Sequence, residues 1–474
     1  MSEEKLPFKE KFLFGLSAIP DQLTYQIFQF LIFTFYFTVV GIPTPLMILG
    51  YVLWGVWNAF NDPMLGALSE RTKFRGKWGK RKFYLLISII PLCLSMVFMF
   101  FVPFDTSAKL AEFFYFLFII IVFEFFYTLF DVNVNAIFPE MFPTEKKRAA
   151  TNLFIKITTI VALILSALIP VIFIDDYVPD PGDDIQVFKD QYFLTMVVIA
   201  IITFVLALPF LLKGIREKAE TTEDFGKRPS FFQSLKITLK NKTFVKFVIA
   251  NTMVWYCFSI LPIILPIFAD EVMGIDNALI TSIALMSAFL VAAITMPIHR
   301  KLGFRIGMRN AFMLTMGIWI ISLFPYMFIS GVQLQITFII ITAIQGFSLG
   351  GTLFYVDIVH ADVIDEDALK FGVKRSASYY GINAFIHRIS IILVILTLWS
   401  MFGGIGWEKE YEFVVPDPFL KELGLKALMF IFPAIALVIG ILFMRSYGLH
   451  GERLKEMREE LEKHPELKTE LKPV

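Results

Sequence analysis

The sequence contains few cysteines, few histidines and few charged residues for its length. Only two of its 474 residues are cysteine, and Cys93 and Cys257 both lie in apolar segments without the spacing of a metal site. This excludes a disulfide framework, a structural zinc site and a thiol nucleophile. The five histidines form no HExxH motif, and no GxSxG motif is accompanied by a plausible triad. We therefore expect neither an enzyme nor a cofactor.

Charged residues make up 18% of the chain, whereas soluble domains average about 25%. Hydrophobic residues reach 57%, 54 residues are Phe, and a single core could not hide this much apolar surface from water. The 43 basic and 42 acidic residues nearly cancel, so no basic field points to nucleic acid. The composition indicates that the protein is solvated by a lipid bilayer.

Apolar segments long enough to span a membrane recur along the whole chain. A spanning helix needs about 20 mostly apolar residues, and these segments are far longer than the alternating strands of a barrel. We therefore predict an all-α membrane protein with twelve transmembrane helices in two six-helix halves. The predicted spans lie near residues 13–39, 45–68, 83–103, 112–139, 150–174, 191–213, 243–268, 277–298, 305–330, 333–357, 379–403 and 423–445.

The basic residues predict the orientation, because Lys and Arg collect in short cytoplasmic loops. They concentrate in residues 71–82, 146–148 and 300–309, whereas the alternate loops, 175–190 and 408–417, are acidic. This pattern predicts a multi-pass protein of the cell membrane with both termini in the cytoplasm. The charged segment 1–11 leads into a span broken by Pro20 and Asp21, which is unlike a signal peptide.

A long polar segment after the sixth span divides the chain. We predict an N-terminal six-helix bundle over residues 1–214 and a cytoplasmic central loop over 215–242. A C-terminal six-helix bundle over 243–446 and a cytoplasmic tail over 447–474 would follow. The basic loop after span two has a weak echo after span eight, which is consistent with two related halves, although any cytoplasmic loop is basic.

Several ionisable residues fall inside the predicted spans: Asp21, Asp62, Glu124, Asp131, Lys156 and Arg388. Each such group costs about 2.5–3.5 kcal/mol at the bilayer centre if it is unpaired, so the six should face one another or a wet cavity. Four carboxylates and two cations leave a deficit of positive charge. This deficit favours a bound cation or a retained proton.

On span two, Asn58, Asn61 and Asp62 stand at i, i+3 and i+4 and share one helix face. Pro63 cannot donate to the carbonyl of Ala59, which leaves another oxygen available. Such oxygens suit a hard cation, and a buried Asp62 would equally suit a proton. The alternative is hydrogen bonding between helices.

Span four carries a polar stripe of Glu124, Thr128, Asp131 and Asn135, with Tyr127 beside it. Gln22, Gln26 and Gln29 repeat helical spacing next to Asp21. Lys156 and Arg388 could partner carboxylates or form fixed ion pairs that hold the halves together. His387 could relay protons or make an ordinary polar contact.

These residues belong to segments that resemble a known family. NAFNDPMLGALSERT at 58–72 with the following GKWGKRKFYLL, YTLFD at 127–131, and ADVIDEDALKFGVKRSASYYG at 361–381 are similar to signatures of the glycoside-pentoside-hexuronide:cation symporters. That family, which includes melibiose permease, is a branch of the major facilitator superfamily. The third segment is similar to the family's loop before helix eleven.

The resemblance implies which residues bind cation and solute. The cation site would comprise Asn58, Asn61, Asp62 and Thr128, with sodium at Asp62 as the one possible metal. The solute site would comprise Asp21, Tyr127, Asp131, Asn135, Lys156 and Arg388. Sodium-using members have a carboxylate where Asn58 stands, which favours a proton here. Asn135 stands where melibiose permease has Trp, and Glu124 has no counterpart.

The sequence thus predicts a secondary symporter that couples a proton or sodium to a small solute, such as a sugar, by alternating access. Its partners would be that solute and membrane lipid, and not nucleic acid. Because the segment AIPDQLT at 18–24 differs from the permease, a lysolipid or other amphiphile carrier of the same superfamily is the alternative. A sensor that binds without transporting is a further possibility.

Overall fold

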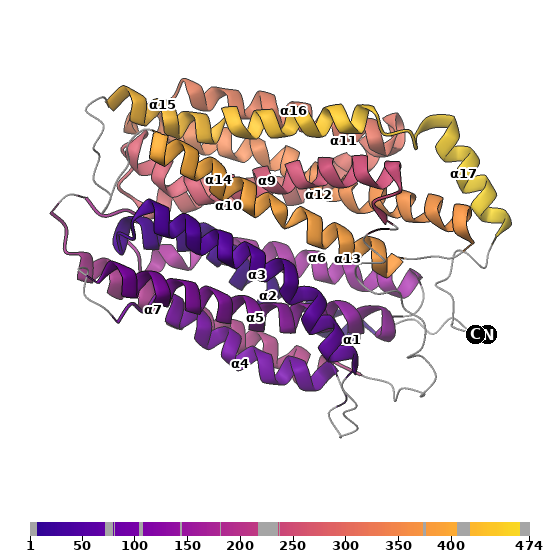
Figure 1. The fold of residues 1–474 in the computed structure, drawn as a ribbon, viewed down its shortest axis with the longest axis horizontal. Coiled ribbons are helices and arrows are strands. Elements are labelled where there is room, and N and C mark those ends of the chain that lie inside the picture. Colours follow the sequence, from indigo (N-terminus) through magenta and orange to yellow (C-terminus); the bar gives the residue numbers. More distant parts are fainter. Residues whose placement is uncertain are drawn as a thin grey trace. The chain divides into compact units, whose positions relative to one another are not determined.

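The computed structural model describes residues 7–71, 79, 81–103, 108–142, 145–180, 182–216, 236, 238–372, 376–404 and 418–464. Helices are the regular elements throughout this described part, and no strand occurs there (Figure 1). Most of the predicted central loop, the basic residues between 72 and 78, the acidic loop after residue 404 and the end of the tail lie outside the described residues.

Helices occupy all twelve predicted spans. Nine of them, in the part of the chain that is described, are long and apolar enough to cross a membrane by length and composition. The first, second and eleventh spans fall outside that criterion and are formed by α2, α3 and the pair α13 and α14. The prediction of an all-α, multi-span membrane protein is confirmed.

The N-terminal helices are α1 (Phe8–Gly15), α2 (Ala18–Thr34), α3 (Thr44–Arg71), α4 (Arg81–Met99), α5 (Lys109–Met141), α6 (Glu145–Leu168) and α7 (Ile185–Pro209). The C-terminal helices are α9 (Lys242–Glu271), α10 (Ala278–Ile306), α11 (Met308–Leu323), α12 (Gln335–Phe371), α13 (Ser376–His387), α14 (Ile389–Gly404), α15 (Pro418–Met429), α16 (Ile431–Arg445) and α17 (Gly451–Lys463). Short π-helical turns, Phe35–Val39 and Phe210–Gly214, follow α2 and α7.

The structure corrects the predicted loop before span eleven. Residues 361–371 are helical and extend α12 to Phe371 instead of ending it near residue 357. The helix stops at Gly372, whose φ of +69° is the left-handed conformation that glycine adopts at helix ends. Asp362 and Glu366 in this segment pair with arginines of the last helix, and Val363 and Ile364 are buried, so ion pairs and apolar packing together stabilise the extension.

Spans eleven and twelve are each two helices. Span eleven is interrupted at Arg388, where the Ile391 amide donates to the Arg388 carbonyl in an i to i+3 bond of 3.2 Å. Span twelve is interrupted at Phe430, four residues after Lys426. Pro433 lies three residues beyond this break and has no amide hydrogen for the carbonyl of Met429, which explains the interruption.

The described residues group into two compact units. The first contains residues 1–220, 262–286 and 399–421, and the second contains 221–261, 287–398 and 422–474, in each case where they are described. The predicted four-part division of the chain stays a prediction.

Aromatic side chains fill the core of the first unit. Phe14 at the end of α1 packs against Phe138 of α5, against Phe142 just after this helix and against Phe210, with ring centroids 5.1–5.6 Å apart. Tyr36 is fully buried and donates to the Met99 carbonyl at 2.8 Å. Buried edge-to-face rings contribute beyond their area, so the high Phe content serves packing as well as contact with lipid.

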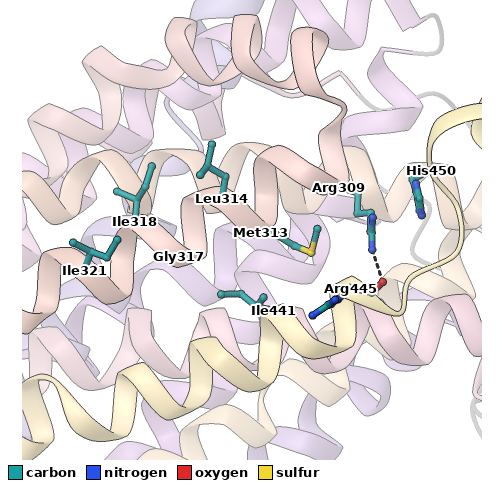
Figure 2. Close-up of a pocket in the computed structure, with 9 residues that line it drawn as sticks. All are labelled: Arg309, Met313, Leu314, Gly317, Ile318, Ile321, Ile441, Arg445 and His450. Carbon is teal, nitrogen blue, oxygen red and sulfur yellow. Dashed lines mark hydrogen bonds between the residues drawn. The ribbon is translucent and has the colours of Figure 1, made fainter.

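Small residues set the packing of the second unit. Gly346 and Gly350 stand one turn apart on α12 where this helix crosses α10, and a Cβ at Gly350 would lie 2.5 Å from the Ala292 carbonyl oxygen. Such small-xxx-small spacing lets transmembrane helices approach closely. On another face, α11 and α16 border an open groove (Figure 2).

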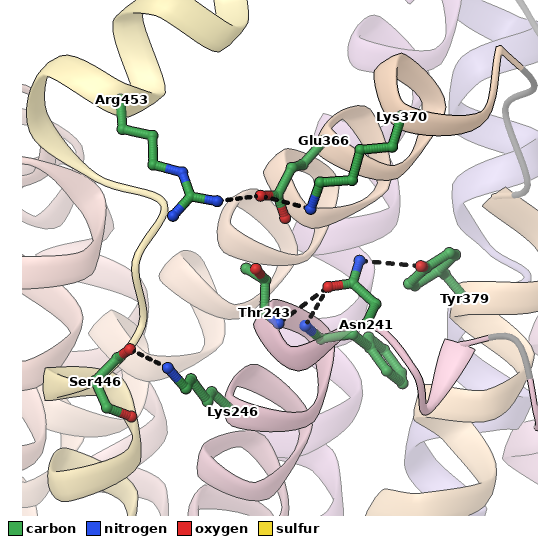
Figure 3. A network of polar contacts seen from close by, with 9 residues as sticks. Asn241, Thr243, Lys246, Glu366, Lys370, Tyr379, Ser446 and Arg453 are labelled. Atoms are coloured by element: carbon green, nitrogen blue, oxygen red, sulfur yellow. Dashed lines mark hydrogen bonds and ion pairs between the residues drawn. The ribbon is translucent and has the colours of Figure 1, made fainter.

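The last helix, α17, is anchored to the extended end of α12. Arg453 and Lys370 both contact Glu366, at 2.8 and 2.9 Å (Figure 3). Arg458 pairs with Asp362 at 2.8 Å. Met457 of α17 is buried as well, so both charge pairing and apolar contact hold α17 in place.

Candidate functional site

The predicted helix face on α3 is present and buried. Asn58 is 2% exposed, Asn61 is fully buried, and Asp62 is half-buried. The Asn61 amide donates to the backbone carbonyl of Glu124 on α5 at 3.1 Å. The polar face of α3 therefore packs against α5 rather than against lipid.

Glu124 of α5 completes the polar contact between α3 and α5. Its side chain is fully buried, and its carboxylate accepts from the Trp54 indole at 3.2 Å and from the Thr128 hydroxyl at 3.2 Å. The same Thr128 hydroxyl lies 3.1 Å from a carboxylate oxygen of Asp62. Two carboxylates thus converge on one hydroxyl, which has a single hydrogen and can donate to only one of them at a time.

The polar contact between α3 and α5 also contains oxygen atoms that accept no hydrogen bond within the described structure. These are the side-chain oxygens of Asn58 and Asn61, both buried. A buried polar atom that is left without a hydrogen bond costs about 1–3 kcal/mol, so binding of a ligand that supplies the missing interaction is favoured. Carboxylate, amide and hydroxyl oxygens together form the donor set that a hard cation prefers, and the carboxylates equally accept a proton. We call these five residues, Asn58, Asn61, Asp62, Glu124 and Thr128, the α3–α5 seam.

A second polar group lies at Asp21 on α2. Tyr127 of α5 donates its hydroxyl to one Asp21 oxygen at 2.6 Å, and the Gln22 amide donates to the other at 2.6 Å. Lys156 of α6 attracts the Asp21 carboxylate electrostatically. Tyr25 stacks on Tyr127 with ring centroids 5.1 Å apart. Three helices thus bring an acid, a base and an aromatic face together.

The remaining predicted solute residues are less tightly grouped. Asn135 donates to Asp131 at 2.7 Å, one turn away on α5, and Asn135 is exposed. Arg388 is half-buried between α13 and α14 in the second unit, and its part in a solute site stays a prediction. The side chain of His387 lies outside the described residues.

Sequence reasoning placed Glu124 on the polar stripe of span four but gave it no role. The structure shows that its carboxylate shares Thr128 with Asp62. Trp54 was missed altogether, because an indole in an apolar run looks like a lipid-facing aromatic. The spacing of Glu124 and Thr128, four residues apart, was the available signal.

The helical fold is that of the major facilitator superfamily, and the family and relatives of this chain are membrane transporters and not enzymes. A solved structure of a variant of the nucleoside transporter NupG superposes with a TM-score of 0.62 at 15% identity. That superposition covers 93% of this chain and 100% of the other. At this identity the similarity concerns the fold.

Within that superfamily, residues 13–451 match the family described as MFS/sugar transport protein, and the chain belongs to it. The predicted glycoside-pentoside-hexuronide type is thereby confirmed. The uncharacterized symporter YjmB of Bacillus subtilis is 22% identical over 97% of this chain and 97% of its own length.

Two further relatives match over shorter segments. The uncharacterized symporter sll1374 of Synechocystis is 28% identical over 32% of this chain and 29% of its own length. The sodium-dependent lysophosphatidylcholine symporter 1 of Gallus gallus is 24% identical over 55% of this chain and 48% of its own length. The chain thus spans less than half the length of these two relatives.

Proposed function

We propose that the protein is a secondary symporter of the cell membrane that couples a proton or sodium to the uptake of a sugar or related polar solute. The observation that carries this proposal is the α3–α5 seam, where two carboxylates share one hydroxyl beside two unbonded amide oxygens. Such a site favours a cation or a proton over an empty, fully ionised state.

The seam supports coupling through its charge. The distances from Thr128 place oxygens of Asp62 and Glu124 within roughly 6 Å of each other, and like charges that close are costly where water is scarce. Glu124 supplies a second carboxylate near the position where Asn58 replaces one. This restores an oxygen set for sodium, so sodium and a proton both fit the seam.

The group around Asp21 supports a polar solute. Carboxylates accept hydrogen bonds from sugar hydroxyls, and a lysine donates to sugar oxygens. Tyr25 and Tyr127 add an aromatic surface that can pack against the apolar face of a sugar ring. Because Tyr127 and Thr128 are adjacent on α5, a shift of this helix would act on solute and cation groups together.

Coupling follows from the energy of an empty seam. With both carboxylates ionised and no cation bound, the seam resists the dehydration that alternating access requires. A bound cation or proton removes this cost. Cation and solute are then expected to move together.

The test is uptake into proteoliposomes with imposed proton or sodium gradients and a panel of labelled sugars. Asp62→Asn should abolish uphill accumulation and leave downhill exchange measurable. Asp190→Asn, which removes an exposed carboxylate at the start of α7, is the matched control and should behave as the natural protein. Accumulation by Asp62→Asn at the level of the natural protein would reject the coupling role.

Solute binding is tested separately. Lys156→Gln should lower solute affinity in counterflow while the response to the cation gradient persists. A change in coupling with unaltered solute affinity would move Lys156 out of the solute site.

A second candidate is a lysolipid carrier, favoured by the similarity to the lysophosphatidylcholine symporter over 55% of this chain. Lysophosphatidylcholine would then compete with labelled sugar for binding, or would be transported while no sugar is. Uptake of a sugar that lysophosphatidylcholine does not inhibit would exclude this candidate.

A further inference from the structure

The groove bordered by α11 and α16 has a volume of about 780 Å³ and lies wholly within the second unit (Figure 2). It belongs neither to the α3–α5 seam nor to the group at Asp21. Its lining is apolar over most of its length and basic at one end. Such a volume falls in the range that binds small molecules, about 300–1,000 Å³.

The apolar part follows one stripe of α11. Met313, Gly317 and Ile321 recur every four residues after Arg309, with Leu314 and Ile318 beside them. The helix rises about 18 Å from Arg309 to Ile321. This is slightly more than half of the roughly 30 Å hydrocarbon core, so the stripe runs the depth of one leaflet.

Gly317 leaves the middle of the groove open. A Cβ at this position would meet no heavy atom within 4 Å, so no neighbouring side chain fills the space beside Gly317. Ile321, further along the stripe, is 73% exposed. The groove therefore offers a continuous apolar surface with room for a chain-like apolar ligand.

The basic end is formed by Arg309, Arg445 and His450. In the described part of the chain, no carboxylate pairs with either arginine. Arg309 donates to the Met444 carbonyl at 2.8 Å. It also donates to the Arg445 carbonyl (Figure 2), and both bonds fix its guanidinium beside the end of α16.

This end has positively charged surroundings, which oppose protonation of His450. Burial lowers the pKa of His450, and the nearby guanidinium groups of Arg309 and Arg453 lower it further. On the other side, Lys246 of α9 donates to the Ser446 carbonyl at 2.5 Å (Figure 3). An anion at this end would relieve the repulsion among these cations.

The basic end lies at the same end of α11 as Arg300, Lys301 and Arg305, which the positive-inside rule assigns to the cytoplasm. The cytoplasmic leaflet contains anionic lipids, and basic pockets between helices on this side bind their headgroups.

We propose that the groove binds one anionic phospholipid of the cytoplasmic leaflet. The lipid phosphate lies between the Arg309 and Arg445 guanidinium groups, and one acyl chain follows the stripe from Met313 to Ile321. Arginine suits the phosphate because its planar fork donates two hydrogen bonds at once. The apolar stripe adds the burial of acyl methylenes, while ordinary annular contact would not select a headgroup.

The test uses the full-length protein, purified in mild detergent and titrated with dioleoyl phosphatidylglycerol or dioleoyl phosphatidylcholine, with bound lipid counted by native mass spectrometry. The natural protein should retain one phosphatidylglycerol more tightly than phosphatidylcholine. Arg445→Gln should weaken phosphatidylglycerol retention about fivefold, because one basic residue near a lipid surface contributes about 1 kcal/mol. Arg445→Lys keeps the charge and should retain most of the binding.

Matched variants separate groove from surface charge. Arg305→Gln removes an arginine at the end of α10, which does not line the groove, and should leave retention unchanged. Gly317→Phe fills the groove and should remove the bound lipid whichever headgroup it has, whereas Gly317→Ala leaves space. Free glycerol 3-phosphate should not compete at the same concentration, because it lacks the acyl chain.

Only monodisperse variants are compared, and Arg445→Lys and Gly317→Ala keep the test valid if a harsher change disrupts folding. Equal retention of both lipids by the natural protein would overturn the proposal. So would phosphatidylglycerol retention that survives both Arg445→Gln and Gly317→Phe.

Discussion

Two regions of the protein have carboxylates on long helices, but the partners of these carboxylates differ. At the end of α12, Asp362 and Glu366 each meet a guanidinium group of α17, at 2.8 Å in both cases. In the α3–α5 seam, Asp62 and Glu124 share the hydroxyl of Thr128.

The two arrangements differ in whether they leave polar atoms that a ligand could bind. Cross-helix ion pairs at the end of α12 already neutralise the acid groups, and they hold α17 in place. In the α3–α5 seam, amide oxygens of Asn58 and Asn61 are buried without hydrogen bonds inside the described structure. The ion pairs at the end of α12 thus make a structural contact, whereas the seam combines buried amide oxygens with two carboxylates that share one hydroxyl, and from this combination we infer a site for a cation or proton.

Apart from the loss expected in Asp62→Asn, the largest effect is expected where the seam loses its second carboxylate. Glu124→Gln keeps the size of the side chain but halves the acidic charge of the seam, so coupled accumulation should fall at least tenfold. A hydrogen bond to a charged group contributes about 1.5–3 kcal/mol, which corresponds to that loss or more. The measurement is gradient-driven uptake in proteoliposomes as a function of sodium and proton concentration.

Glu112→Gln is the matched control for Glu124→Gln. Glu112 is also a fully buried carboxylate on α5, but it pairs with Lys109 at 3.6 Å near the helix start. Its removal should leave the cation dependence of uptake unaltered. Equal losses in the two variants would show that the carboxylates of the seam do not differ in function from an ion-paired carboxylate.

A smaller effect is expected at the paired carboxylates. Arg458→Gln leaves the mostly buried Asp362 without its partner and should loosen α17 by about 1–2 kcal/mol, since the arginine is 54% exposed and partly screened. Hydrogen exchange of residues 451–463 should accelerate, while coupled transport should persist. The double variant Arg458→Gln with Asp362→Asn should recover part of the loss, and a coupling defect in either would contradict a structural role.

The sequence predicted the fold well because membrane-spanning helices depend on a simple physical requirement. Every backbone group must be satisfied within the helix, and long apolar runs indicate where this happens. The extension of α12 to Phe371 escaped prediction because its ion-pair partners lie 87 and 96 residues away, on α17. No local sequence pattern in residues 361–371 predicts the ion pairs with α17.

The candidate site was predictable only in part, for a related reason. Helical spacing placed Asn58, Asn61 and Asp62 on one face, and the structure shows this face against α5. Which residue of α5 completes it depends on the register between two helices, and the sequence does not contain that register. Glu124 therefore remained unassigned until its carboxylate was seen beside Thr128.

The smallest effect is expected at a third group of carboxylates, outside the spans. Asp176 lies with Asp270 and Asp276 in the first unit, with ligand oxygens within 4.8 Å of one another. The pKa of Asp176 is raised to about 6, mainly because the carboxyl is buried; amide hydrogen bonds from Val178 and Tyr177 oppose this rise, and the charges of Asp276 and Asp180 add to it.

Because the pKa of Asp176 is higher in the folded protein than its ordinary value of 3.8, the folded state holds the proton more tightly. Stability should be greatest below about pH 4, decline as the pH rises to about 6, and then level off, with solvent screening limiting the change to about 1 kcal/mol. Asp176→Asn should flatten this part of the thermal-unfolding profile, whereas Asp190→Asn should preserve it. A profile that keeps its slope in Asp176→Asn would assign the titration to Asp270 or Asp276. It would also show that no single carboxylate dominates this cluster, in contrast to what we propose for the α3–α5 seam.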